Sequence, residues 1–466
     1  MSERYIVAIE IGSSKLRGAV GTADETGMLD VLAVEEEKLT GSVRYGCINN
    51  VEVSNAISRI CQRLEEYPRI APRTIKGVYV GLGGRSMTST LVDVEARLPA
   101  ELEITREIIT DLRNRAAHNI PQERDVAEVV PVKFTVDNKT QANPVGSYGT
   151  SVGSRMCVVS CQPVIKRMIR RVLSERLGFE INGYVTRPLA EGSLALTDDE
   201  RRLGCMLVDF GAETTTVVIY KNGAPVYVAT LPLGSRNITL DLTALNYIEE
   251  RAEEIKKVSG NAMGAETGRR PGADGIDYSE VNNYVHARAA EIVTNILAQI
   301  DYADMRAADL PGGIILVGGG SRLRGFNELL AQQSKMKVRM GTTQAAVRIS
   351  DSAINPAENI DVIATLAVAA RMPMAECMAE PEQRQDADPA GSDPYDNYDD
   401  NGDDDEETSR IGRLDEDDDE FAPRRKKKKD KEPASRDSDN HSSRGFSIFS
   451  SLRKKIAGIM DEGDEM

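Results

Sequence analysis

Histidine is scarce in this sequence, and its cysteines lack a metal-binding spacing. The 466 residues contain three widely scattered histidines, His118, His286 and His441. Three separated histidines therefore argue against a histidine-rich metal site and against a Ser/His/Asp triad. No two cysteines have the C-x-x-C spacing, and most lie in apolar segments, as reduced core residues do. The six cysteines are Cys47, Cys61, Cys157, Cys161, Cys205 and Cys377.

Long hydrophobic runs are also missing. No uninterrupted apolar stretch approaches the roughly 20 residues that cross a bilayer. The N-terminal sequence MSERYIVAIEIG has no basic region before its apolar residues, as a secretory signal would have. We therefore expect a chain that is neither secreted nor membrane-spanning and that resides in the reducing cytosol.

The folded part lacks a surplus of positive charge. The formal net charge is -16, and residues 386–420 alone hold 17 acidic residues and two arginines, a balance of -15. The rest of the chain is thus nearly neutral. Because binding to nucleic acid through a broad basic face needs an excess of Lys and Arg, we expect no nucleic-acid partner.

Apolar runs separated by turn residues predict strands mixed with helices. Residues 5–21 indicate two strands around a Gly-Ser-Ser turn, and residues 205–228 indicate the strands MLVDF, TVVIY and PVYVA. The run GIILV predicts a further strand before a Gly-Gly-Gly turn. This mixture predicts an α/β fold. Apolar residues at intervals of three and four predict helices at residues 55–66, 163–177 and 279–305.

Two segments interrupt this pattern. Residues 88–161 indicate a separate α+β unit, with strands near LVDVEARL, VAEVVPVKFTV and RMCVVSC and a helix at 105–119. From residue 374 the apolar periodicity disappears, so we predict a disordered tether that reaches residue 444. The acidic block of the tether, 386–420, is most simply a solvated linker. The basic block, 424–431, indicates binding to an anionic membrane surface.

Two tight turns of small residues suit phosphate binding, because backbone N–H groups can approach phosphate oxygens closely there. Each turn follows an acidic residue at a strand end, Glu10 and Asp209. Two carboxylates beside two such turns are the arrangement expected for a hydrated Mg2+. Alone, each turn is more often an ordinary hairpin. The turns consist of Gly12, Ser13, Ser14 and Lys15, and of Gly211, Ala212, Glu213, Thr214 and Thr215.

The order of these motifs resembles the phosphate 1, phosphate 2 and adenosine order of the actin, Hsp70 and sugar-kinase superfamily. The resemblance implies a two-domain actin-like (ribonuclease H-like) α/β fold that closes over ATP and Mg2+. It implies that Glu253 and Lys256 contact the ribose and base. It also places the adenine over Gly318, Gly319 and Gly320. Without the flanking motifs, Glu253 and Lys256 would be a surface ion pair one helical turn apart.

Within this superfamily the sequence is most similar to the FtsA family of bacterial cell-division proteins. The segments VEVSNAISRICQRLEE, VYVGLGGRSMTS, NPVGSYGTSVGSRM and LPLGSRNITLDL carry the resemblance, which spans about residues 5–372. It implies an FtsA-type 1C insertion in the place of actin's 1B. The implied parts are subdomain 1A (1–87), 1C (88–162), the return to 1A and interdomain connection (163–203), 2A (204–234), 2B (235–309), the second part of 2A (310–373), a disordered charged linker (374–444) and a membrane-targeting amphipathic helix (445–460).

The second phosphate turn departs from the superfamily's pattern. Ala212 and Glu213 stand where glycines are usual, and Thr216 stands where many relatives have an acid. A carboxylate at position 213 would repel phosphate oxygens unless a cation or an outward rotamer intervenes. We therefore expect ATP binding with slow or undetectable hydrolysis, and we assign no catalytic residue.

The residues after the tether form an amphipathic pattern. At about 100° per residue, seven apolar side chains share one broad face, and Ser450 and Ser451 lie opposite. Such a helix lies in a bilayer interface. Docking on the folded body is the alternative, although the whole tether separates the two. The expected membrane-binding residues are Phe446, Ile448, Phe449, Leu452, Arg453, Lys454, Lys455, Ile456, Ile459 and Met460.

The family resemblance implies a membrane adaptor at the inner face of the cytoplasmic membrane, at the division septum. Its implied partners are the C-terminal tail of FtsZ, further copies of itself in an actin-like polymer, anionic lipid and other divisome proteins. The FtsZ tail is expected near residues 283–303, where Arg288 and Glu291 match the family's helix. A sugar kinase is the alternative, but neither insertion shows the catalytic base it would need. An Hsp70-type chaperone would instead end in a β-rich peptide-binding domain.

Overall fold

The computed structural model describes residues 4–24, 28–39, 43–44, 47–265, 275–343, 347–373 and 375–380, all within the compact unit Met1–Asp386. The predicted amphipathic helix at 445–460 and the tether from residue 381 onward lie outside these residues. Within the described ranges, no helix combines the length and the apolar character needed to cross a membrane.

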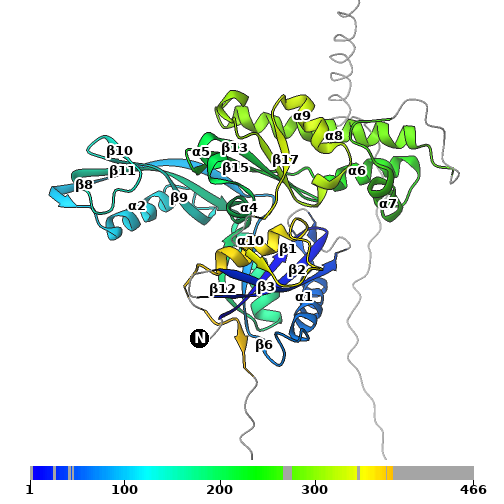
Figure 1. The fold of residues 1–466 in the computed structure, drawn as a ribbon, viewed down its shortest axis with the longest axis horizontal. Helices are drawn as coiled ribbons and strands as arrows, with labels where there is room; N and C mark the ends of the chain where they lie inside the picture. The colour runs from blue at the N-terminus through cyan, green and yellow to red at the C-terminus, as the bar shows by residue number, and fades with distance from the viewer. Residues whose placement is uncertain are drawn as a thin grey trace, which may run out of the picture. The chain divides into compact units, whose positions relative to one another are not determined.

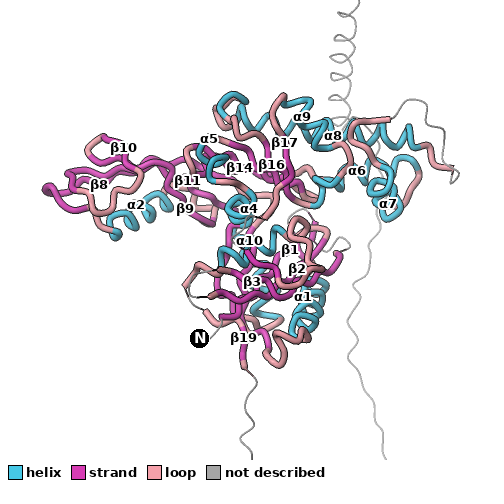
Figure 2. Tube along the Cα trace, in the orientation of Figure 1, coloured by secondary structure: helices cyan, strands magenta, loops and turns pink. Residues whose placement is uncertain are grey.

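The first lobe is built on a six-stranded sheet (Figures 1 and 2). Its first three strands form antiparallel hairpins, and β7 and β12 extend the sheet in parallel from β1, giving the order β12-β7-β1-β2-β3-β18. All of β7 and most of β1 are buried, as expected for a covered sheet. Helices α1 (Asn50–Glu65) and α10 (Ile360–Ala369) pack against the sheet. Its strands are β1 (Arg4–Ile11), β2 (Lys15–Ala23), β3 (Leu29–Lys38), β7 (Gly77–Leu82), β12 (Glu180–Thr186) and β18 (Val347–Ile349).

The second lobe repeats this strand order. Strands β13, β14 and β15 form antiparallel hairpins, and β16 and β17 extend in parallel from β13, so that β17-β16-β13-β14-β15 corresponds to β12-β7-β1-β2-β3. The chain passes from β12 to β13 through helices α4 (Arg187–Ala195) and α5 (Asp198–Leu203). The β1 and β13 strands therefore occupy equivalent positions in the two lobes. The strands are β13 (Cys205–Phe210), β14 (Thr215–Lys221), β15 (Ala224–Leu231), β16 (Ile314–Val317) and β17 (Val338–Met340).

Helices cover the second sheet and build its core. The longest of them, α8, begins where the Asp277 side chain accepts hydrogen bonds from the N–H groups of Ser279 and Glu280. Phe210 at the end of β13 stacks on Phe326 of α9, with ring centroids 4.4 Å apart. This core supports the strand end that carries Asp209. The helices are α6 (Ser235–Leu242), α7 (Glu249–Ser259), α8 (Tyr278–Tyr302) and α9 (Phe326–Ser334).

The predicted α+β unit within residues 88–161 is present as an extension of the second sheet. Its strand order is β10-β9-β11-β8, and Thr88 of β8 pairs with Ala229 of β15. The unit has a hydrophobic core of its own, in which Leu112 and Met156 are fully buried. Its elements are β8 (Thr88–Glu103), α2 (Arg106–His118), β9 (Asp125–Val136), β10 (Lys139–Gln141) and β11 (Tyr148–Cys161).

Most of the predicted strands and helices are confirmed. The strands predicted within residues 5–21 and 205–228 and at GIILV are β1, β2, β13, β14, β15 and β16. The helix predicted from residue 55 begins five residues earlier, because the Asn49 side chain caps it. Five cysteines are buried free thiols, as expected, and the side chain of Cys47 lies outside the description.

One predicted boundary is wrong. The tether does not begin at residue 374, because β19 (Met378–Ala379) pairs with β6 (Thr74–Ile75) and Cys377 is fully buried. Two apolar side chains enter the core there, too few to produce a periodic pattern. The helix predicted at 163–177 is confirmed in extent, as α3 (Pro163–Arg170) continued by a π-helical turn, η1 (Arg171–Arg176).

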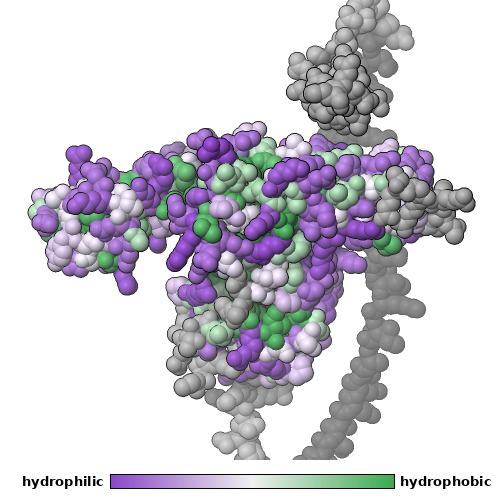
Figure 3. All heavy atoms as spheres, turned by 45° about the horizontal axis from the view of Figure 1, so that its top comes forward, coloured by the Kyte–Doolittle hydropathy of each residue, from purple (hydrophilic) through white to green (hydrophobic). Residues whose placement is uncertain are grey.

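The face of the molecule shown in Figure 3 is mainly polar, with apolar residues in small patches. Exposed large hydrophobic residues are scattered over the body, for example Leu91 and Tyr148 in the insertion and Ile248 and Val258 near α7. Single exposed hydrophobic residues are normal on a protein surface. This face therefore offers no broad apolar area.

Candidate functional site

The two predicted phosphate turns follow equivalent strands of the two sheets. Glu10 lies opposite Arg17 in the β1-β2 hairpin, as Asp209 lies opposite Thr216 in the β13-β14 hairpin. Each turn is closed by a backbone hydrogen bond, from Gly12 N–H to the Lys15 carbonyl (3.1 Å) and from Gly211 N–H to the Thr214 carbonyl (2.9 Å). The duplicated topology therefore brings one turn and one carboxylate from each lobe to the same region.

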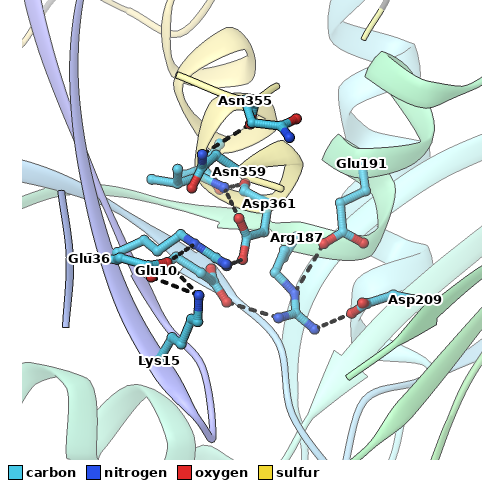
Figure 4. A network of polar contacts seen from close by, with 12 residues as sticks. Glu10, Lys15, Glu36, Arg187, Glu191, Asp209, Asn355, Asn359 and Asp361 are labelled. Atoms are coloured by element: carbon cyan, nitrogen blue, oxygen red, sulfur yellow. Dashed lines mark hydrogen bonds and ion pairs between the residues drawn. The ribbon is translucent and has the colours of Figure 1, made fainter. Parts of the chain in front are cut away.

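Arg187 joins the two carboxylates (Figure 4). Its Nη1 donates to Glu10 Oε1 at 2.9 Å, and its Nη2 donates to Asp209 Oδ2 at 2.6 Å. Its Nε lies 3.5 Å from Glu191 Oε1, one turn further along α4. Arg187 is the first residue of α4, the segment that connects the lobes, so its guanidinium reaches one carboxylate of each lobe.

Glycines opposite these side chains leave them room. A Cβ atom at Gly81 would lie 2.0 Å from Glu10 Oε2, and one at Gly318 would lie 2.3 Å from Asp209 Oδ1. A Cβ atom at Gly83 would lie 3.1 Å from Arg187 Nε. Two segments, the end of β7 and the turn after β16, thus carry glycine where a larger residue would displace the network.

Burial dominates the electrostatics of this network. It raises the pKa of Glu10 to about 7, against the lowering effect of Arg187. Burial also raises the pKa of Asp209 and, more strongly, that of Glu191, where the nearby Asp209 charge adds to the effect. The three carboxylates hold the pKa of Arg187 well above its usual value despite its burial. One guanidinium therefore compensates three buried carboxyl groups, and Glu10 Oε2 and Glu191 Oε2 accept no hydrogen bond from the described residues.

A second ion pair lies beside this network in the first lobe. Arg17 Nη1 donates to Asp361 Oδ2 at 2.5 Å, which joins β2 to the first turn of α10. Lys15, a predicted phosphate ligand, donates to Glu36 Oε1 at 2.7 Å and is one-third exposed. Lys15 must exchange this partner to contact a phosphate.

The second phosphate turn rests on the N-terminus of α6. Ser235 and Arg236 donate their N–H groups to the carbonyls of Gly211 and Ala212 at 2.9 and 2.8 Å. The Arg236 side chain pairs with Glu213 at 3.0 Å. The cation required to offset Glu213 is therefore present, although the sequence did not show which residue supplies it.

Glu253 and Lys256 form the expected pair on α7, but the pair is not a surface one. Lys256 is only 6% exposed, and its Nζ donates to Glu253 Oε2 at 2.6 Å and to Thr239 Oγ1 at 2.9 Å. It also donates to the Ser235 carbonyl at the start of α6. Glu253 and Lys256, the predicted ribose and base contacts, thus lie next to α6, on whose N-terminus the second phosphate turn rests.

The triple glycine lies next to the second strand end. Val317, just before it, pairs in parallel with Asp209. Gly318 has φ +85°, and Gly320 is packed against Phe210, where a Cβ atom would lie 2.8 Å from the Phe210 carbonyl. These glycines are therefore needed for the chain to turn closely beside Asp209. The structure brings together the two turns, the two carboxylates and the triple glycine.

The predicted partner residues lie elsewhere, on α8. Arg288 Nη2 donates to Asp241 Oδ1 of α6 at 2.9 Å, and its Nη1 contacts Glu291. Arg288 therefore ties α8 to α6, while the Glu291 side chain is half exposed. The predicted membrane-binding residues lie outside the described part of the chain.

Sequence reasoning missed Arg187 and Arg236. An Arg-Pro pair after a strand indicates only a helix start, because proline favours the first turn. Which carboxylates the arginine meets depends on the packing of the two lobes. The signal available in the sequence was an arginine in the segment that links the two halves.

The duplicated sheets and the facing strand turns define an actin-like, two-lobed ATPase fold with an inserted α+β unit. The model described as "Cell division protein FtsA" matches residues 206–366, and "SHS2 domain inserted in FTSA" matches residues 84–160. The cell division protein FtsA of Porphyromonas gingivalis is 32% identical over 357 residues, covering 73% of this chain and 74% of that protein. That of Pseudomonas aeruginosa is 28% identical over 370 residues, covering 76% and 87%. The chain belongs to the FtsA family of cell division proteins.

One solved structure is similar in fold at lower sequence identity. The "PilM-PilN type IV pilus biogenesis complex" matches with a TM-score of 0.57 at 17% identity and covers 79% of this chain and 99% of that chain. At this identity the match speaks for the fold alone.

Proposed function

We propose that this protein binds ATP between its two lobes and acts as a membrane adaptor of cell division. The observation that carries the nucleotide site is the equivalence of the strand ends at Glu10 and Asp209, each followed by a hydrogen-bonded turn of small residues. Backbone N–H groups in such turns bind phosphate oxygens. The Gly318 turn and the Glu253/Lys256 pair adjoin the same region, as an adenosine site requires.

The prediction that Glu10 and Asp209 hold Mg2+ stays a prediction, and the geometry does not fit it. Each carboxylate already accepts a hydrogen bond from Arg187, at 2.9 and 2.6 Å. A divalent ion between them would stand beside a buried guanidinium, where like charges repel strongly. We therefore assign no role in the site to this ion.

Arg236 provides a test of the nucleotide site. We expect Arg236→Ala to weaken ATP binding about tenfold or more. The Glu213 carboxylate would lose the compensating charge of Arg236 and would repel the phosphates at low effective dielectric. The double variant Arg236→Ala/Glu213→Gln should recover most of the affinity. Isothermal titration calorimetry of the full chain measures both. Unchanged affinity in Arg236→Ala would contradict the placement of phosphates at this turn, and a double variant as weak as the single one would mean that Arg236 binds phosphate directly.

The adaptor part of the proposal is supported by family membership and by the amphipathic sequence at 445–460. In this proposal the actin-like body polymerises with further copies of itself and recruits other divisome proteins. The tail holds it at the inner face of the cytoplasmic membrane at the septum.

We further propose that the FtsZ tail binds along α8. Arg288 is engaged by Asp241 and positions the helix, whereas the half-exposed Glu291 is accessible to a peptide. We expect Glu291→Ala to weaken binding of a labelled FtsZ tail peptide about fivefold, the scale of a lost charged contact at an interface rim, without lowering the melting temperature. Fluorescence anisotropy measures this affinity. Glu254→Ala, at an exposed acid on α7, is the matched control. Equal affinities of wild type and Glu291→Ala would remove this residue from the interface.

A further inference from the structure

Arg187 occupies the place between the two strand ends where a cation for the phosphates is expected. Its terminal nitrogens lie 2.9 Å from Glu10 and 2.6 Å from Asp209, and its side chain is 13% exposed. The two carboxylates belong to different lobes, at equivalent positions of β1 and β13. One buried cation therefore lies between the two carboxylates that precede the phosphate turns.

We propose that the Arg187 guanidinium replaces the divalent cation of this nucleotide site, so that the protein binds ATP without Mg2+. This inference rests on the proposed ATP site. The guanidinium is a permanent charge with five N–H donors, and arginine is well suited to phosphate. The contacts with Glu10 and Asp209 use one hydrogen on each terminal nitrogen. The second hydrogen on each nitrogen takes part in no hydrogen bond with the described residues, and in this proposal these two hydrogens are donated to phosphate oxygens.

The surroundings hold the guanidinium in place. Glu191, on the next turn of α4, faces Nε at 3.5 Å, and Gly83 leaves the space that the side chain fills. Pro188 follows Arg187 in the first helical turn, which restricts the backbone at this point. The arginine is therefore positioned by its helix and by three carboxylates. A flexible surface side chain would have no such support.

The charge of this site also differs from that of a metal site. A guanidinium brings one positive charge where Mg2+ brings two, and its position is set by the protein fold. Nucleotide binding should thus persist without the metal. Transition-state stabilisation by a metal would be missing, in agreement with the slow hydrolysis expected from the second phosphate turn.

The first test needs no variant. We expect the full-length wild-type protein to bind ATP with the same affinity, within about threefold, in EDTA and in excess Mg2+, measured by calorimetry. A loss of about tenfold or more in EDTA overturns the proposal. If ATP binds in neither condition, the proposed ATP site itself fails, which is a separate and recognisable result.

The second test exchanges the cation. In Arg187→Gln we expect ATP affinity to fall about tenfold or more in EDTA and to recover on addition of Mg2+. Arg187→Lys keeps the charge but not the two terminal nitrogens, so it should retain part of the affinity in EDTA. Arg339→Gln, which removes a partly buried arginine paired with Glu200 outside the candidate site, is the matched control. Equal ATP affinity of Arg187→Gln in both conditions overturns the proposal.

A third readout is independent of the nucleotide. Electron paramagnetic resonance of Mn2+ should show tighter Mn2+ binding to Arg187→Gln than to the wild type, because the two carboxylates become available to the ion. Tight Mn2+ binding to the wild type at this site, lost in Asp209→Asn, would overturn the proposal even if ATP does not bind.

Discussion

Truncation after Arg444 is expected to release this protein from anionic vesicles almost completely. If residues 445–460 form the helix that their sequence predicts, seven apolar side chains on its one face would contribute about 7 kcal/mol at a discounted 1 kcal/mol each, before the cost of ordering the helix. Without them, only the basic block 424–431 attracts the lipid, and salt screens that attraction at physiological ionic strength. Co-sedimentation of the full and truncated chains with liposomes measures the difference.

A point variant tests the same helix with less disturbance. Phe449→Glu places a charge in the middle of the apolar face and should reduce co-sedimentation nearly as much as truncation. Ser450→Glu introduces the same charge on the opposite face and should leave most of the binding intact. If the truncated chain still co-sediments at physiological salt, residues 445–460 are not the anchor.

The estimated anchor energy also bears on assembly. Folding the helix consumes much of the 7 kcal/mol, so a single tail binds reversibly. Several tails linked in one polymer bind together with a much higher effective concentration. In the proposed adaptor, a polymerising body and a weak anchor would therefore complement each other.

Local sequence pattern predicted most of the fold and much of the site. The hairpins around Glu10 and Asp209 were predictable, because apolar strands flank turns of small residues there. The insertion was predictable because it carries its own strands and helix. The predicted start of the tether at residue 374 was wrong. Cys377 and Met378 pack into the core beyond it, and two residues are too few to give a recognisable pattern.

The structure brings the two predicted turns, the two carboxylates and the triple glycine together, but the charge partners of these residues were not predictable. Lys15 of β2 contacts Glu36 of β3, and Glu213 contacts Arg236 of α6, so each contact joins two different elements. Arg187 follows the same rule, since its two carboxylates come from strands about 177 and 22 residues away. Sequence patterns identify such groups as polar and cannot identify their neighbours.

Arg187→Leu is expected to lower the melting temperature more than most single substitutions in the body. It leaves Glu10, Asp209 and Glu191 buried without their shared counter-charge, and removing one partner of a buried ion pair costs about 3–5 kcal/mol. For a folded unit of this size that corresponds to a decrease of roughly 4–6 °C in a thermal melt followed by circular dichroism.

The compensating variant distinguishes lost charge balance from lost packing. Neutralising the carboxylates as well, in Arg187→Leu/Glu10→Gln/Asp209→Asn, should restore much of the melting temperature, because replacing a whole buried ion pair is often nearly neutral. Mg2+ should raise the melting temperature of Arg187→Leu, where it can take the place of the guanidinium, and should leave that of the wild type unchanged. A melting temperature of Arg187→Leu equal to that of the wild type would show that the three carboxyl groups need no counter-charge. In that case the arginine would not be the cation that holds the two strand ends together.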